Sequence, residues 1–142
     1  VFHLQRSSTL LAWELFCLGR PVINETFSHG HIESRLEVWI EGEPLLIERQ
    51  HLADGDLTPV AEHPWIGTLL FYPATEPLLD TAREALAPLE HFAGATLTDG
   101  LLSVRFLAHD NLICQQAMRE IWQRLRPQLT AKAPCSPRIW HT

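Results

Sequence analysis

The sequence is short of basic residues, and almost all of those that it has are arginine. Its 142 residues include 11 Lys and Arg against 17 Asp and Glu, which gives a formal net charge of −6, and Lys132 is the one lysine. Proteins that bind nucleic acid obtain much of their affinity by neutralising phosphates with basic side chains. The charge balance therefore predicts that nucleic acid is not a partner.

Long hydrophobic runs are also missing. Apolar stretches such as residues 10–13 and 15–18, which Glu14 separates, are only four residues long, whereas a membrane-spanning helix needs roughly 20 apolar residues. We therefore expect no membrane segment, and the N-terminus has no recognisable secretory signal. The three cysteines, Cys17, Cys114 and Cys135, are odd in number and far apart, which fits neither a disulfide framework nor a structural zinc site. A reducing, cytoplasmic location is expected.

Catalytic signatures are absent as well. The sequence contains no Gly-x-Ser-x-Gly, no phosphate-binding Gly-x-x-x-x-Gly-Lys, no His-Glu-x-x-His and no Gly-x-Gly-x-x-Gly. One enzymatic alternative remains, a small cytoplasmic α+β hydrolase or lyase that uses Cys17 with a histidine and a glutamate. A cysteine inside a strand is more often a small apolar residue.

What the sequence does contain is typical of one globular domain. Hydrophobic residues make up 46% and charged residues 20%, which is enough to bury a core. Alternation of apolar and polar side chains predicts strands. These strands are expected at residues 8–17, 32–40, 45–52, 67–72, 95–98 and 101–108. Turn residues at Glu41-Gly42 and Asp99-Gly100 predict that two pairs of them form β-hairpins.

Two segments near the C-terminus show helical periodicity instead. Residues 75–92 have an apolar face, with Thr75 as the expected N-cap and a break or kink expected at Pro88. A second helix is predicted from Asn111 to about residue 126, capped by Asp110 and ended by Pro127. Its predicted apolar stripe consists of Ile113, Ala117, Ile121 and Leu125, supported by Leu112, Met118 and Trp122. The order of elements indicates a mainly β or α+β fold with two helices in the second half.

Glu14 and Glu48 are acidic residues within apolar strands. A carboxylate in such a place is costly unless it is paired or hydrated. Glu48 can face solvent or pair with an arginine such as Arg49 or Arg35. Alternatively, both carboxylates line a water-filled channel, where oxygen ligands pass a divalent cation along without holding it tightly. The residues alone leave both interpretations open.

Other candidate residues are weaker. His29 and His31 lie two apart around a glycine, but two imidazoles make an incomplete metal site, and loop histidines without a metal role are the simpler interpretation. On the last helix, Met118 and Trp122 are candidates for partner binding, because tryptophan is favoured at binding hot spots. Ile139 and Trp140 in the irregular tail are further candidates for partner contact.

Several strings resemble one known family over the whole chain. They are Trp13-Glu14-Leu15-Phe16-Cys17-Leu18-Gly19-Arg20-Pro21, Leu45-Leu46-Ile47-Glu48-Arg49, Tyr72-Pro73-Ala74-Thr75, Val104-Arg105-Phe106-Leu107 and Pro137-Arg138-Ile139-Trp140-His141-Thr142. In these the sequence is similar to the urease accessory protein UreD family, called UreH in some bacteria. Family members are longer, so the resemblance implies that residues 1–142 are the C-terminal portion of a single UreD-like domain whose N-terminal half is absent.

The resemblance also implies a fold and a function. The implied fold is a layered, β-helix-like stack of strands with two α-helices in the C-terminal half. The implied function is not enzymatic: the protein binds urease apoprotein and, with UreF and the GTPase UreG, supports nickel insertion into urease. No tightly bound cofactor is implied, only transient Ni²⁺, and a nickel route through the interior favours the channel interpretation of Glu14 and Glu48. A plain interaction module, in which both carboxylates are only salt-bridged, is the remaining alternative.

Overall fold

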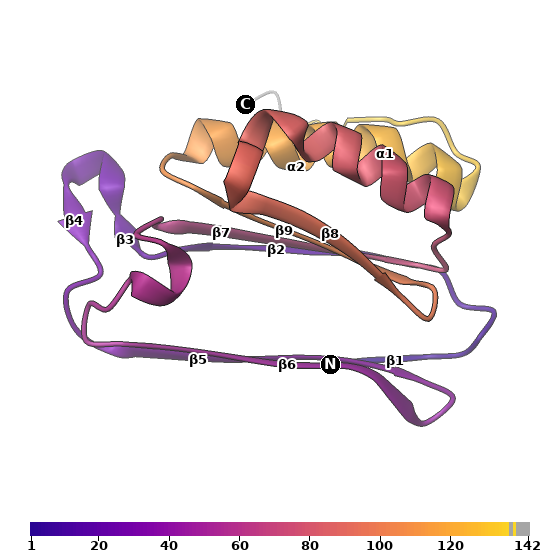
Figure 1. Ribbon diagram of the computed structural model, residues 1–142, viewed down its shortest axis with the longest axis horizontal. Coiled ribbons are helices and arrows are strands. Elements are labelled where there is room, and N and C mark those ends of the chain that lie inside the picture. The colour runs from indigo at the N-terminus through magenta and orange to yellow at the C-terminus, as the bar shows by residue number, and fades with distance from the viewer. Residues whose placement is uncertain (137, 139–142) are drawn as a thin grey trace.

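The computed structural model describes residues 1–136 and 138, which form three layers (Figure 1). The strands in this part of the chain are β1 (Phe2–Leu4), β2 (Leu10–Cys17), β3 (Gly19–Arg20), β4 (Glu25–Thr26), β5 (His31–Ile40), β6 (Glu43–Ala53), β7 (Trp65–Tyr72), β8 (Ala93–Thr98) and β9 (Leu101–Ala108). The α-helices are α1 (Glu76–Leu86) and α2 (Asn111–Thr130), and the short 3₁₀ helices are η1 (Pro21–Ile23), η2 (Thr58–Val60) and η3 (Ala87–Phe92).

Two sheets face each other, and the helices cover the outer face of one of them (Figure 1). The larger sheet has the antiparallel order β2-β7-β9-β8, and the smaller has the order β1-β5-β6, in which β1 runs parallel to β5. A short β3–β4 ribbon stands at one end of the molecule. The prediction of a layered, mainly β fold with two C-terminal helices is confirmed.

Apolar side chains fill both interfaces between the layers. Between the helices and the larger sheet the core includes Phe71, Val104 and Phe106, all almost completely buried. Between the two sheets a second cluster forms around Val38 and Leu70. Because β7 lies in the middle layer, both of its faces are covered, which explains why, apart from Thr68, its sequence is apolar on both faces rather than alternating.

The strand predictions hold with small shifts at the ends, because the turns that separate the strands have specific chemistry. Glu41 and Gly42 both have positive φ, as do Asp99 and Gly100. Positive φ at both central residues defines a type I′ turn, whose twist matches that of the flanking strands. Both predicted hairpins, β5–β6 and β8–β9, are therefore confirmed.

The first helix follows the prediction, and Thr75 occupies the N-cap position, although no side-chain cap bond forms there. The chain changes to the 3₁₀ helix η3 at Ala87, directly before Pro88. This confirms the predicted break, because proline removes an intrahelical hydrogen bond and its ring clashes with the preceding turn.

The second helix corrects two predictions. Pro127 does not end α2, which continues to Thr130. Near this end Thr130 Oγ1 donates to the Arg126 carbonyl at 2.8 Å and Gln128 Nε2 donates to the Arg124 carbonyl at 3.3 Å, while the Ala131 amide donates to the carbonyl of Pro127 at 2.9 Å. The buried stripe also contains Cys114 in place of Ile113, which is 40% exposed. The other three residues of the predicted stripe, Ala117, Ile121 and Leu125, are buried as predicted, so the difference is confined to the first turn of the helix.

Candidate functional site

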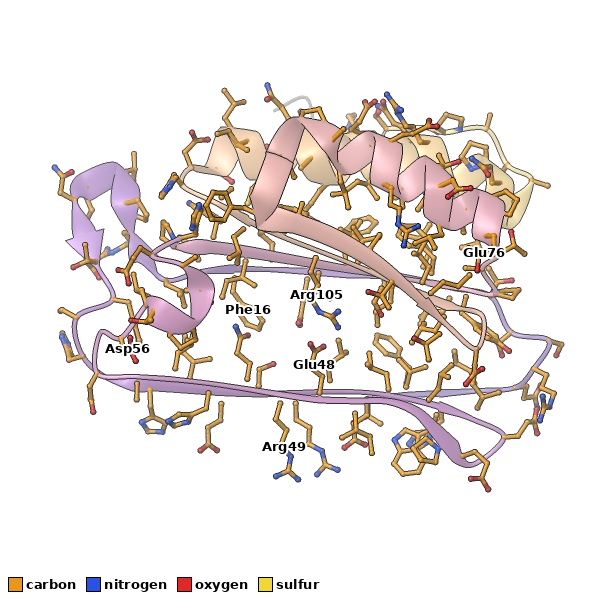
Figure 2. All side chains as sticks on the ribbon, in the orientation of Figure 1. Phe16, Glu48, Arg49, Asp56, Glu76 and Arg105 are labelled. Atoms are coloured by element: carbon orange, nitrogen blue, oxygen red, sulfur yellow. The ribbon has the colours of Figure 1, made fainter. Side chains whose placement is uncertain are left out.

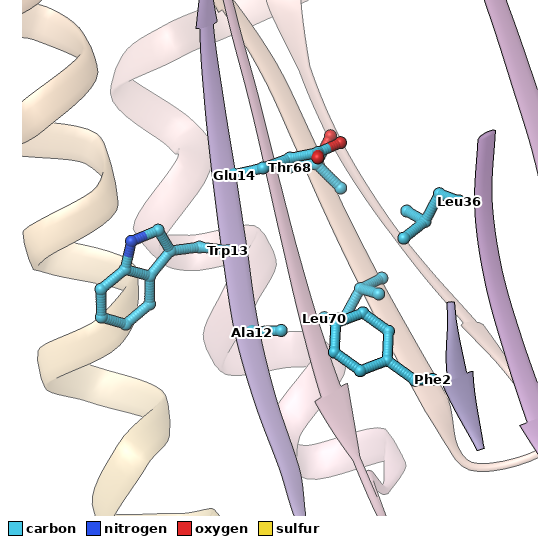
Figure 3. Close-up of a pocket in the computed structure, with 7 residues that line it drawn as sticks. All are labelled: Phe2, Ala12, Trp13, Glu14, Leu36, Thr68 and Leu70. Carbon is cyan, nitrogen blue, oxygen red and sulfur yellow. The ribbon is translucent and has the colours of Figure 1, made fainter. Parts of the chain in front are cut away.

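Three polar side chains form a row across the larger sheet. Glu14 on β2 pairs in register with Thr68 on β7, and Thr68 pairs with Arg105 on β9. Residues directly opposite each other in a sheet point to the same face, and here that face looks toward the smaller sheet. Figure 3 shows Glu14 and Thr68 side by side and pointing toward Leu36 of β5, while Trp13 points the opposite way, toward the helices.

The smaller sheet contributes a second carboxylate. Glu48 on β6 lies opposite Leu36 in the β5–β6 register, and its Oε2 atom is 2.5 Å from Nη2 of Arg105. Figure 2 shows the two side chains meeting between the sheets. Both are 38% exposed, so the pair is partly hydrated. This contact bridges the two layers.

The partner of Glu48 differs from those suggested by the sequence. Arg49 points away from the space between the sheets (Figure 2), and Arg35 forms its ion pair with Glu37 on the same strand. Alternation along β6 explains the first result, because neighbouring residues of a strand face opposite sides. The arginine that pairs with Glu48 is instead 57 residues away in the sequence.

A cavity of about 180 Å³ opens between the sheets at this point. Its lining includes two carboxylates, two hydroxyls, one amide and the guanidinium of Arg105, whereas the side chain of Arg49 points away from the space between the sheets (Figure 2). The residues are Glu14, Ser34, Leu36, Glu48, Arg49, Gln50, Ile66, Thr68 and Arg105. A smaller, more apolar pocket of about 50 Å³ shares Glu14, Leu36 and Thr68 with it (Figure 3). The structure thus brings both predicted carboxylates to one polar space.

Most of the side-chain atoms in this cavity that could coordinate a metal ion are oxygen atoms, and oxygen ligands suit hard or borderline divalent cations. Within residues 1–136 and 138, no group of three or more His, Cys, Asp or Glu side chains could hold a metal ion. With Arg105 included, the two carboxylates leave one net negative charge. The arrangement can attract a cation while offering it few fixed ligands.

The predicted histidines lie elsewhere. His29 is exposed, with its Nδ1 atom 3.0 Å from Ser28 Oγ, and His31 is exposed at the start of β5. Neither lines the cavity that holds Glu14 and Glu48.

The thiol of Cys17 is not arranged as a nucleophile. Its Sγ atom donates to the carbonyl of Gly19 at 3.3 Å, and partial burial raises the pKa of the Cys17 thiol. A nucleophilic cysteine needs a lowered pKa and a neighbouring base. The enzymatic alternative therefore gains no support from this residue.

The partner-binding candidates on α2 are corrected. Trp122 is only 5% exposed, with Arg126 over its ring, and Met118 packs against the core under the helices. They do not form an exposed apolar patch, and the large apolar residues of α2 that are exposed, Leu112 and Ile113, lie in its first turn. Ile139 and Trp140 lie outside the described residues.

Sequence reasoning missed Thr68 and Arg105. A signal for Arg105 was present, since it is the one charged residue in the apolar strand Leu101–Ala108. A charge there needs a partner, and the only acidic residues singled out in similar strands were Glu14 and Glu48. Thr68 carries no comparable signal, because threonine is common in strands.

Comparison with known proteins gives a consistent result. Residues 1–141 match the family model described as UreD urease accessory protein. The chain is 78% identical over all 142 residues to the urease accessory protein UreD of Enterobacter sp. (strain 638), covering 52% of that protein. It is 66% identical over 141 residues to that of Klebsiella aerogenes (99% of this chain, 52% of the relative) and 44% identical over 141 residues to that of Pseudomonas entomophila (99% and 51%). The chain spans about half the length of these relatives and belongs to the UreD urease accessory protein family.

Proposed function

We propose that the protein acts in the maturation of urease as a scaffold and a transient conduit for Ni²⁺, and not as an enzyme. In this proposal it binds urease apoprotein in the cytoplasm and works with UreF and the GTPase UreG, so that nickel reaches the urease active site in a GTP-dependent step. Nickel is cargo here, and no resident cofactor takes part. Support comes from the family and from the relatives, each named as an urease accessory protein.

The observation that carries the proposal is the cavity between the sheets with Glu14 and Glu48 in its lining. A space of about 180 Å³ accommodates several water molecules, so a cation can keep part of its hydration shell there. The hydroxyls of Ser34 and Thr68 and the amide of Gln50 add neutral oxygen donors. A hydrated cation therefore finds oxygen atoms on both sheets.

Arg105 sets how strongly the cavity attracts a cation. Its guanidinium is paired with Glu48, so a cation that approaches Glu48 competes with a positive charge already there. Because Arg105 already neutralises the charge of Glu48, the pair attracts a cation less strongly than a free carboxylate would, which keeps binding weak. Weak binding suits a conduit, because cargo held tightly is not released.

A second interpretation is favoured by the same contact. The Glu48–Arg105 pair joins the two sheets, which is also what a purely structural ion pair in an interaction module does. In that case the two carboxylates can be neutralised without effect on urease maturation.

The experiment that separates these interpretations uses the full-length protein. Glu14→Gln and Glu48→Gln keep the shape of the side chains and remove the charges, and Glu33→Gln is the matched control because Glu33 is exposed on β5 and does not line the cavity. Purified urease apoprotein is activated with each variant, UreF, UreG, Ni²⁺ and GTP. We expect each cavity variant to lower the yield of active urease while complex formation on a sizing column is unchanged. Activation equal to that of the control would reject the conduit.

A further inference from the structure

The row of polar side chains on the larger sheet ends in a glycine. Glu14, Thr68 and Arg105 stand on β2, β7 and β9, and Gly94 on the edge strand β8 pairs in register with Arg105. A Cβ atom at Gly94 would point to the same face of the sheet as Arg105, and it would meet no atom within 4 Å. Arg105 therefore has a polar neighbour on one side and open space on the other.

This open space belongs to a groove beside β8. The groove has a volume of about 320 Å³, and its mainly apolar lining includes Gly94. Because β6 and β8 are edge strands of their sheets, the groove lies at the margin of the two stacked sheets. It shares three lining residues with the polar cavity, Gln50, Ile66 and Arg105. The two spaces are therefore neighbours, and the side chain of Arg105 lies at their boundary.

Glu48 holds Arg105 on the cavity side of this boundary, with 2.5 Å between Oε2 and Nη2 (Figure 2). Both side chains are 38% exposed, and ion pairs with such exposure are weak because water screens them. Among the described residues that line the groove there is no carboxylate, so none of them competes with Glu48 for the guanidinium. Pairing with Glu48 is therefore the resting position of Arg105.

Gly94 provides room for a second position. Paired residues on neighbouring antiparallel strands have Cβ atoms about 4.5–5.5 Å apart, a distance that the long side chain of Arg105 spans. A cation that binds Glu48 repels the guanidinium, and the space over Gly94 accepts the displaced group. This movement uncovers Glu48 and opens the boundary between the cavity and the groove.

We propose that Arg105 gates the polar cavity by moving between two positions, one paired with Glu48 and one over Gly94. The gate rests on the proposed function, because the cation that it controls is the Ni²⁺ of that proposal. In the closed position Arg105 neutralises Glu48 and separates the cavity from the groove. In the open position a hydrated cation has both carboxylates of the cavity available and a way to the margin of the sheets.

The test changes the room beside Arg105 without altering any oxygen atom of the cavity. Gly94→Leu and Gly94→Val fill the space over Gly94. Thr98→Leu is the matched control, because Thr98 is exposed on the same face of β8 but lines neither the cavity nor the groove. Equilibrium dialysis measures the nickel affinity of the full-length protein. We expect both Gly94 variants to bind nickel about fivefold more weakly, since Arg105 then stays on Glu48, and the control to bind as the unchanged protein does.

A double variant separates an effect that acts through Arg105 from one that does not. When Gly94→Leu is combined with Arg105→Met, no guanidinium remains to be held on Glu48. We expect the nickel affinity of this double variant to equal that of Arg105→Met alone. A further loss in the double variant would overturn the gate, because leucine would then act on the cavity without the arginine.

Unchanged nickel affinity in both Gly94 variants would overturn the gate as well, while leaving the conduit in place. The proposed function fails in a different way. If Glu14→Gln and Glu48→Gln both leave the nickel affinity of the full-length protein unchanged, the cavity does not bind the cation, and the conduit and its gate are rejected together.

Discussion

Arg105 of β9 and Glu48 of β6 join the two sheets across their interface, with 2.5 Å between Nη2 and Oε2. The other ion pairs in the described residues lie within one strand, ribbon, hairpin or helix. Because both side chains are 38% exposed, water screens the attraction, and such pairs contribute less than about 1 kcal/mol to stability.

The first prediction concerns the stability of this pair. Arg105→Met in the full-length protein should lower the free energy of unfolding by less than about 1 kcal/mol, since apolar contacts hold the sheets together. Urea unfolding followed by tryptophan fluorescence measures the change. A loss of 3 kcal/mol or more would show that the pair behaves as a buried one, whose disruption leaves an uncompensated charge.

The second prediction concerns Gly67, where β7 passes Phe106. A methyl group at Gly67 would overlap the ring of Phe106, which pairs with Gly67 across the β7–β9 register and lies in the core under the helices. Gly67→Ala should therefore destabilise the protein by about 1–3 kcal/mol. Gly94→Ala is the matched control, because a methyl group at that strand position meets nothing within 4 Å. Equal unfolding midpoints for the two variants would contradict the close contact.

The third prediction follows from the buried carboxyl of Glu37. A hydrogen bond from Trp39 Nε1 at 2.8 Å, and then the charge of Arg35, hold the pKa of Glu37 below its ordinary value. A carboxyl with a lowered folded-state pKa stabilises the protein above its unfolded pKa of about 4.3, and that stability is lost as pH falls below it. Glu37→Gln should thus reduce stability at pH 7 and flatten its decline below about pH 5. The control is Glu33→Gln on the same strand, and parallel curves for both variants would be inconsistent with the assignment.

The fourth prediction distinguishes the cysteines. Burial, and then the charge of Asp110, raise the pKa of the Cys114 thiol to about 11, so this thiol stays protonated at pH 8. Cys135 is exposed. Iodoacetamide at pH 8 should modify Cys135 in the native protein and leave Cys114 intact until urea is added, as peptide mass spectrometry can determine. Labelling of Cys114 at the same rate as Cys135 would mean that the first turns of α2 open readily.

Local chemistry explains which parts of the fold could be predicted from sequence. The Asp99-Gly100 turn, the cap at Asp110 and the break before Pro88 each depend on a few neighbouring residues, and all three are found. The burial of Cys114 instead of Ile113 in the first turn of α2 was not predictable, because both residues are apolar and only packing decides which is buried.

The site was predictable only in part for the same reason. A carboxylate within an apolar strand is recognisable from the sequence, so Glu14 and Glu48 can be predicted as candidate site residues. Their common cavity depends on how two sheets stack, and the pairing of Glu48 with Arg105 spans 57 residues. Alternation along a strand gives the face of each side chain but not which distant strand lies opposite.

The central position of β7 has a consequence for synthesis on the ribosome. Its hydrogen-bonding neighbours are β2, made much earlier, and β9, made some 30 residues later. While the chain is still growing, β7 therefore has one open edge and an apolar face that awaits the helices. Unpaired apolar edges of this kind are sites of aggregation. The edge of β7 stays open until β9 emerges, and the face of β7 that packs under the helices stays uncovered until α1 and α2 emerge.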